Sequence, residues 1–176
     1  QRQSGLDERA ASIDPGNKFY WRYDLHRLDA ESIRDALLAV SGTLDTTMGG
    51  SLVPVKNREF FFNHTSEDKA SYENIDRRSI YVPVVRNHLY DVFKLFDYTD
   101  ASVLNGNRES STIAPQALML LNSDLMTKLS SATADRLLET ERSSAERINQ
   151  LFELAYSRPA LMAESDQIVN YLRQLE

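Results

Sequence analysis

The sequence predicts a mainly α fold: a compact multi-helix domain with a small β-hairpin or ribbon. Three observations predict it. Apolar residues recur at helical spacing over most of the chain, and capping residues bracket several of these stretches. Two short runs rich in aromatic and β-branched residues interrupt them. A length of 176 residues, with 41% hydrophobic and 26% charged residues, fits one globular domain over residues 1–176.

The first clear helix is expected at LDAESIRDALLAVSG, residues 28–42. Asp29 can act as the N-cap, since its carboxylate can accept backbone N–H groups of the first turn. Gly42 suits the left-handed position that follows a helix. Ile33, Leu37 and Val40 share one face, and we expect them to be buried.

The second half of the chain is expected to be helical throughout. Pro115 suits the first turn of one helix, and Ser143 with Glu146 forms a capping box before another. Arg158-Pro159 should end that helix. The expected apolar stripes of these helices are Leu89, Val92, Phe93 and Phe96; Ile148, Leu151, Phe152 and Ala155; and Ile168, Leu172 and Leu175.

The β element is expected in REFFFN, residues 58–63, and RRSIYVPVV, residues 77–85. Side chains alternate along an extended segment, so Arg78, Ile80 and Val82 should point to one side. With Ile80 and Val82 facing the core, Arg78 should be buried and paired, and Arg77 should be more exposed. A buried arginine must have partners because an unpaired buried charge is far more costly.

Composition excludes several function classes. A net charge of −6 disfavours binding to nucleic acid. The absence of cysteine excludes iron–sulfur clusters, thiol nucleophiles and covalent haem attachment in this chain. No apolar run reaches the ~20 residues of a membrane span, so membrane insertion is not expected. The three histidines (His26, His64 and His88) lie on separate segments, and we expect no metal and no cofactor.

Catalytic motifs are weak. Ser66-Glu67-Asp68-Lys69 matches S-x-x-K, but it lies in a polar stretch, and S-D-N and K-T-G are missing. G-x-S-x-G and nucleotide-binding glycine loops are also missing. We therefore do not expect an enzyme, and an unrecognised hydrolase ranks last among the hypotheses.

Two groups of residues are candidate binding sites. Trp21 and Tyr23 lie in FYWRY, residues 19–23, which could stack on a sugar; anchoring of this segment on the core is the favoured alternative. The second group could grip carboxylate, sulfate or phosphate, although ion pairs between elements are favoured. Its members are Arg77, Arg78, Arg86, Arg108 and Gln116.

Several stretches together resemble a known family, the planctomycete-specific PSD-one domain. They are LDAESIRDALLAVSG with TMGG, RRSIYVPVVR, LFDYTD, STIAPQALMLLN and AYSRPALMAE. That family is a domain of unknown function, and it supplies no catalytic residues. The resemblance implies a C-terminal fragment of a large exported protein, behind a cytochrome c-like domain. It therefore implies an extracytoplasmic location, a haem carried only by an upstream domain, and neighbouring domains of the same polypeptide as partners.

The leading hypothesis is a non-catalytic structural or interaction module of an exported, cytochrome-linked bacterial protein. The alternative is a module that binds glycans, sulfate or other anions. An exposed apolar patch would favour docking to protein. Converging arginines in a pocket, or an exposed Trp face, would favour ligand binding.

Overall fold

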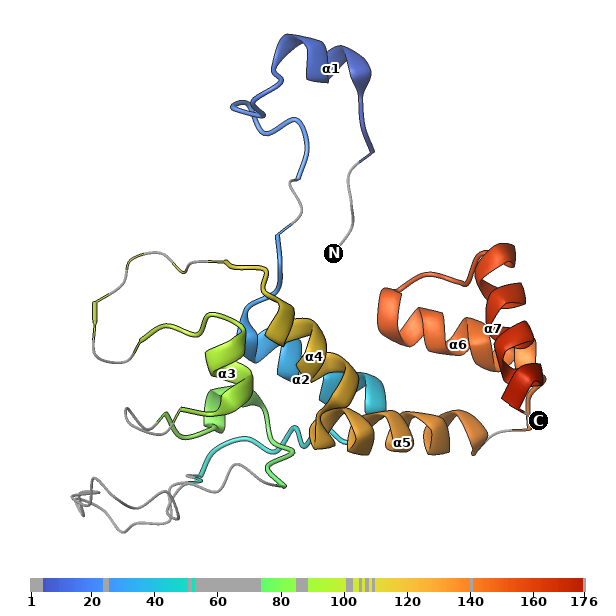
Figure 1. The fold of residues 1–176 in the computed structure, drawn as a ribbon. Helices are drawn as coiled ribbons and strands as arrows, with labels where there is room; N and C mark the ends of the chain where they lie inside the picture. Colours follow the sequence, from blue (N-terminus) through green and yellow to red (C-terminus); the bar gives the residue numbers. More distant parts are fainter. Residues whose placement is uncertain are drawn as a thin grey trace.

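The computed structural model describes residues 5–23, 26–50, 52, 74–84, 89–100, 103–104, 106, 108, 110–139 and 141–175. Within these residues the fold is mainly α, with seven α-helices, one 3₁₀ helix and no β-strand (Figure 1). The elements are α1 (Glu8–Ile13), α2 (Ala30–Ser41), the 3₁₀ helix η2 (Ser79–Tyr81), α3 (Asp91–Leu95), α4 (Ala114–Asn122), α5 (Asp124–Leu138), α6 (Ser144–Tyr156) and α7 (Met162–Leu175).

Helix α2 is the centre of the described fold and contacts α5, α3 and η2. It begins after Asp29, as predicted, although the Asp29 carboxylate makes no capping hydrogen bond. It ends at Gly42, whose φ of 80° is left-handed, as predicted. Arg136 of α5 donates to the carbonyls of Ala39 and Val40, so α5 supplies donors to the last turn of α2.

The buried face of α2 differs from the prediction. Its buried members are Ala30, Arg34, Leu38 and Ser41. The predicted Ile33, Leu37 and Val40 are only half-buried. The physical reason is that the polar atoms on the buried face have partners: the Ser41 hydroxyl donates to the Leu38 carbonyl at 2.9 Å, for example.

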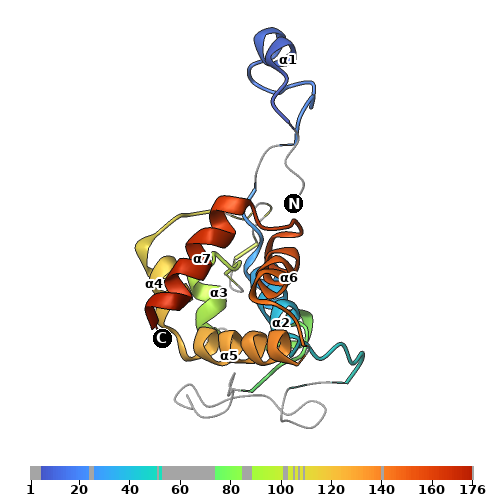
Figure 2. The ribbon, with the colours of Figure 1, turned by 90° about the vertical axis from the view of Figure 1, so that its right-hand side faces the viewer.

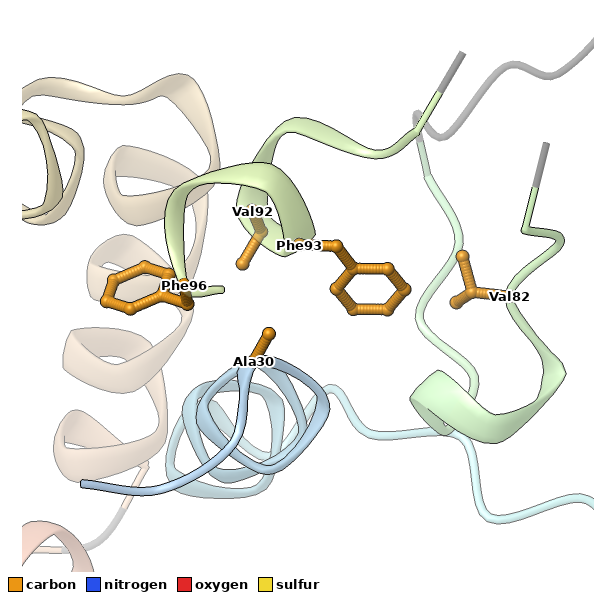
Figure 3. Close-up of a cluster of buried hydrophobic side chains, with 5 residues drawn as sticks. All are labelled: Ala30, Val82, Val92, Phe93 and Phe96. Carbon is orange, nitrogen blue, oxygen red and sulfur yellow. The ribbon is translucent and has the colours of Figure 1, made fainter. Parts of the chain in front are cut away.

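A second group of buried side chains forms the core between α2, α3 and the residues after η2 (Figure 3). Val92, Phe93 and Phe96 are buried, and Leu89 packs at their edge, so the predicted stripe is confirmed. The remaining core residues are Ala30 and Val82.

The segment around η2 is not the predicted strand. Residues 79–81 form a 3₁₀ turn, and Asp45 and Arg77 form a single isolated parallel bridge. A 3₁₀ helix repeats every three residues rather than two, so Ser79 and Val82 turn inward together. Val82 is buried as predicted, but Ile80 and Arg78 are exposed, so their predicted burial is wrong. The other half of the hairpin, residues 58–63, lies outside the described residues.

The helices after α4 are bounded largely as predicted. Pro115 lies in the first turn of α4, and the Ser123 hydroxyl caps α5 by accepting from the Met126 N–H. Ser143 and Glu146 form the predicted capping box of α6. Helices α6 and α7 pair with each other, and α6 also contacts α5 (Figure 2). None of the described helices is long and apolar enough to cross a membrane.

We call residues 5–23 the N-terminal arm, and both views show its helix α1 standing away from the other helices (Figures 1 and 2). The arm is held by its own contacts: Asp14 accepts from the Phe19 N–H and, through its carbonyl, from the Trp21 indole, both at 2.8 Å. Phe19, Tyr20 and Tyr23 are exposed. The favoured anchoring of these aromatics on the core is therefore wrong, because the arm folds on itself instead.

Candidate functional site

Helix α4 exposes an apolar surface, which we call the α4 face: Ile113, Ala117, Leu118 and Leu121. Leu118 is 58% exposed and Leu121 is 77% exposed. The two leucines are three residues apart, so they lie next to each other on one side of the helix. The helix sequence, APQALMLLN, contains no charged residue. Single exposed apolar residues are common, but a grouped apolar surface is typical of sites that bind protein.

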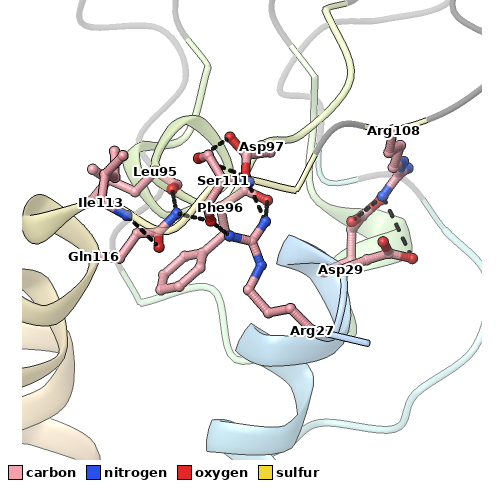
Figure 4. A network of polar contacts seen from close by, with 10 residues as sticks. Arg27, Asp29, Leu95, Phe96, Asp97, Arg108, Ser111, Ile113 and Gln116 are labelled. Carbon is pink, nitrogen blue, oxygen red and sulfur yellow. Dashed lines mark hydrogen bonds and ion pairs between the residues drawn. The ribbon is translucent and has the colours of Figure 1, made fainter. Parts of the chain in front are cut away.

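The opposite side of α4 is fixed by Gln116, which is buried (Figure 4). Its amide nitrogen donates to the carbonyls of Leu95 at 2.8 Å and Ser111 at 3.2 Å, and its oxygen accepts from the Ile113 N–H. Gln116 therefore ties α4 to the end of α3. This anchoring sets which face of α4 remains outside.

Beside Gln116, Arg27 and Asp97 form an ion pair of 2.6 Å between Nη2 and Oδ2 (Figure 4). Arg27 also donates to the carbonyls of Phe96 and Ser111. The Ser111 hydroxyl and its backbone N–H both donate to Asp97, at 2.8 and 2.7 Å. The network joins the segment before α2, the end of α3 and the segment before α4.

The electrostatics of Asp97 agree with a structural role. The backbone N–H of Ser111, followed by the Arg27 guanidinium, lowers the pKa of Asp97 from its usual value. Asp97 has a φ of 57°, and the hydrogen bonds to its side chain help to hold this uncommon conformation. The Ser111 hydroxyl donates to this carboxylate, and the contact holds the segment before α4 against the end of α3.

The predicted arginines do not converge. Arg77 donates to the carbonyls of Thr47 and Gly49 and lies 4.1 Å from the centre of the Tyr81 ring. Arg108 makes a two-bonded ion pair with Glu31, at 2.7 and 2.8 Å. Arg77 thus binds the segment that follows α2, whereas Arg108 binds the first turn of α2. The two arginines therefore contact opposite ends of a helix that is roughly 18 Å long.

The other predicted members are placed separately. Arg78 is exposed, and Arg86 lies outside the described residues. Gln116 serves the α3–α4 contact described above. The described members therefore form ties within the protein or lie apart, and they do not line a common anion pocket.

The two residues predicted to stack on a sugar, Trp21 and Tyr23, make different contacts. The Trp21 indole donates to the Asp14 carbonyl, and the Arg22 guanidinium lies 5.2 Å from the centre of the Trp21 ring. One face of that ring is therefore covered. Tyr23 is exposed, with its ring edge-on to His26 at 5.9 Å. Among the described residues, no group of three His, Asp or Glu side chains could hold a metal ion.

Comparison with protein-family models identifies the family. The model of PSD1, described as a protein of unknown function (DUF1553), matches residues 1–172. The chain belongs to the PSD1 family. The predicted resemblance to the PSD-one domain is confirmed. No curated protein and no solved structure matches this PSD1 domain.

Sequence reasoning missed two features of the PSD1 domain. The sequence analysis predicted the helix at Pro115 but not the exposure of the α4 face; the available signal was that none of the nine residues of APQALMLLN is charged. The sequence analysis made no prediction for Arg34, which is buried. The signal for the burial of Arg34 was its spacing. Arg34 comes four residues after Ala30 and four before Leu38, so it lies on the same side of α2 as these two buried residues.

Proposed function

We propose that this PSD1 domain is a non-catalytic interaction module that docks on another folded protein through the α4 face. The single observation that supports docking is the grouped exposure of Ile113, Leu118 and Leu121 on an uncharged helix. Burying such side chains is favourable by roughly 25 cal/mol per Å² of apolar area. Because Gln116 fixes the other side of α4, the face is already in place before a partner binds.

The partners proposed are neighbouring domains of the same polypeptide, as the family resemblance implies. An extracytoplasmic location is proposed on the same ground. A rigid apolar face suits a permanent contact inside one polypeptide, since apolar interfaces are typical of obligate contacts. The Arg27–Asp97–Ser111 network supports this role by fixing the segments from which α4 begins.

Titration of separately produced neighbouring domains with the 176-residue chain tests the proposal. The double variant Leu118→Ser/Leu121→Ser should weaken binding at least tenfold in calorimetry. Ile80→Ser is the matched control, because Ile80 is 83% exposed on η2 and lies outside the α4 face. Unchanged binding by the double variant, or equal weakening by the control, would show that docking does not use this face.

A glycan-binding module is the second candidate, and the exposed Phe19, Tyr20 and Tyr23 of the arm are the observation in its favour. A glycan and anion array measures it directly. Binding that Tyr20→Ala abolishes and Leu118→Ser/Leu121→Ser retains would favour this second function over docking.

A further inference from the structure

The 3₁₀ helix η2 and the loop after α2 carry a second exposed surface, which we call the η2 surface: Met48, Arg78, Ile80 and Tyr81. Met48 is 81% exposed and Ile80 is 83% exposed. Arg78 is exposed, and Tyr81 is half-buried. These residues come from segments other than α4, so the η2 surface is separate from the α4 face. It combines two apolar side chains, an aromatic ring and a cation.

The backbone of η2 is fixed from its inner side. The N–H and the hydroxyl of Ser79 donate to the Asp35 carboxylate, at 2.8 and 2.6 Å. Ser79 and Val82 are buried, whereas Ile80, which lies between them in the sequence, points to solvent. The exposed Ile80 therefore belongs to a segment with a defined conformation, and little further ordering of its backbone is needed when a partner binds.

The loop that carries Met48 is attached to the same segment. Arg77 donates to the carbonyls of Thr47 and Gly49, at 2.6 and 2.7 Å. The Gly49 N–H donates to the Tyr81 hydroxyl at 3.0 Å. Met48 stands between the two residues that are held, and its side chain remains in solvent. These contacts keep the exposed methionine near the Tyr81 side chain.

The positive charge of the η2 surface has no ion-pair partner in the part of the chain that the structure describes. The Arg78 guanidinium forms no ion pair with a described residue. The neighbouring Arg77 donates to carbonyl oxygens, which carry no formal charge. Two consecutive arginines therefore lie at this surface without a bound carboxylate, although the chain as a whole has a net charge of −6.

The acidic residues of the adjoining segments are bound elsewhere. Asp76 pairs with Lys128 of α5 at 3.1 Å. Asp45 accepts from the Thr47 N–H at 2.8 Å, and hydrogen bonds from Thr47 are the main cause of its lowered pKa, to which the Arg77 charge adds. Asp45 thus offsets part of the charge of Arg77, whereas the charge of Arg78 is available to a partner.

A ligand that matches this surface carries carboxylates and apolar side chains together. A guanidinium binds a carboxylate through two parallel hydrogen bonds, and methionine adapts to apolar partners of different shapes. A free phosphate or sulfate ion would leave Met48 and Ile80 in water. An anionic membrane is attracted by clusters of about four to eight basic residues, and Arg77 and Arg78 are only two. An acidic protein segment with apolar residues provides contacts for both kinds of side chain.

We propose that the η2 surface binds an acidic, apolar segment of another protein, with a carboxylate on Arg78 and apolar side chains on Ile80 and Met48. This interaction goes beyond docking through the α4 face, since it gives the domain a second surface for a different kind of partner. The net charge of −6 opposes it little at short range, because charges more than about 8 Å apart are largely screened at physiological salt.

Fluorescence anisotropy with labelled peptides and the 176-residue chain tests the proposal. The probe is a peptide of repeated Glu-Glu-Leu-Leu units, and in two comparison peptides Ser replaces Leu or Lys replaces Glu. The probe should bind about tenfold more tightly than either comparison peptide, and added salt should weaken its binding. No binding of the probe overturns the proposal. Equal binding of the peptide without Leu, or of the peptide with Lys, also overturns it.

Variants of the chain locate the contact. Arg78→Gln and Ile80→Ser should each raise the dissociation constant of the probe about tenfold. Arg173→Gln on α7 and Leu138→Ser on α5 are the matched controls, and they should leave it unchanged. All four side chains are exposed, and circular dichroism verifies that the variants remain folded. Unchanged binding by Arg78→Gln, or equal weakening by the controls, overturns the proposal. Binding to phosphatidylserine vesicles that Arg78→Gln and Ile80→Ser abolish would assign the surface to a membrane instead.

Discussion

Arg34 is the buried charge on which the packing around α2 depends. It is 2% exposed, and its guanidinium donates to the carbonyls of Ile75 and Arg77 and to the Ser79 hydroxyl. Its nearest carboxylate oxygen belongs to Asp35, at 3.5 Å. Asp35 in turn accepts from the backbone and hydroxyl of Ser79. One arginine and one aspartate therefore hold η2 against α2, mostly through main-chain acceptors.

Replacing Arg34 by alanine should lower the free energy of unfolding by about 2–5 kcal/mol. The carbonyls of Ile75 and Arg77 lose their donor, and each buried acceptor without a partner costs about 1–3 kcal/mol. Arg78→Ala should change the free energy by less than about 0.5 kcal/mol, because Arg78 is exposed. Urea unfolding followed by circular dichroism compares them, and equal losses would contradict the roles assigned to the two arginines.

The exchange of roles between Arg78 and Arg34 shows where sequence reasoning fails at this scale. The sequence analysis correctly predicted a buried arginine with partners in this part of the core, but it assigned the role to Arg78 instead of Arg34. The alternation rule holds only for extended backbone, and three residues of 3₁₀ helix reverse it. The backbone acceptors of Arg34 lie more than 40 residues away in sequence, so local periodicity holds no information about them.

At the scale of elements, caps and turns were the most predictable features. Gly42, Pro115 and the pair Ser143 and Glu146 have the predicted roles, because each depends on neighbouring residues only. The buried face of α2 was mispredicted because several elements pack around that helix. The exposure of the α4 face was not predicted, because an apolar pattern indicates that a helix face favours burial but not whether the same chain covers it.

Gly42 illustrates how one position joins two helices. A Cβ atom there would lie 3.2 Å from Cδ of Arg136, the residue that caps α2 from α5. Gly42→Ala should therefore cost more than the about 1–2 kcal/mol expected for left-handed backbone alone. Gly49→Ala is the control, since Gly49 has a similar φ of 77° and no atom within 4 Å of the added Cβ. Equal losses in thermal unfolding would show that Arg136 moves aside freely.

The pairing of α6 with α7 contains an acid-sensitive contact. Glu164 accepts from Arg158 and from the Leu161 N–H, and these two interactions, Arg158 first, lower the pKa of Glu164 from 4.5 to about 2. A lowered pKa in the folded state stabilises that state above about pH 4.5, and this contribution is lost as the pH falls toward 2.

Glu164→Gln should therefore destabilise the protein at pH 6 and have a smaller effect at pH 3. Urea midpoints of the variant and the original chain at both pH values measure the difference. Glu141→Gln, at an exposed position before α6, should show no such change. A constant effect of Glu164→Gln at the two pH values would mean that its hydrogen bonds, rather than its charge, hold the start of α7.

For the whole molecule, burial is distributed unevenly. Helix α2 has four buried residues and α3 has two, and they surround the main core. Helix α6 has two, and the described side chains of α7 include none that is buried. The family and the mainly α class were predictable from sequence, since both depend on patterns summed along the chain. The uneven burial was not, because it depends on how the helices meet.

This distribution predicts the order in which parts of the molecule open. Local opening costs least where few apolar contacts are lost, so amide hydrogens of α7 should exchange before those of α2 under native conditions. Helix α7 contacts α6, α6 contacts α5, and the pair lies at one side of the fold, so its opening need not disturb α2 (Figure 1). Hydrogen exchange followed by mass spectrometry resolves the two helices. Leu38→Ala, which removes a residue 1% exposed in α2, should cost about 2–5 kcal/mol and speed exchange in α2 most. Equal protection of α7 and α2 in the original chain would mean that the described helices open only together, and that the α6–α7 pair is held by more than the contacts seen between it and α5.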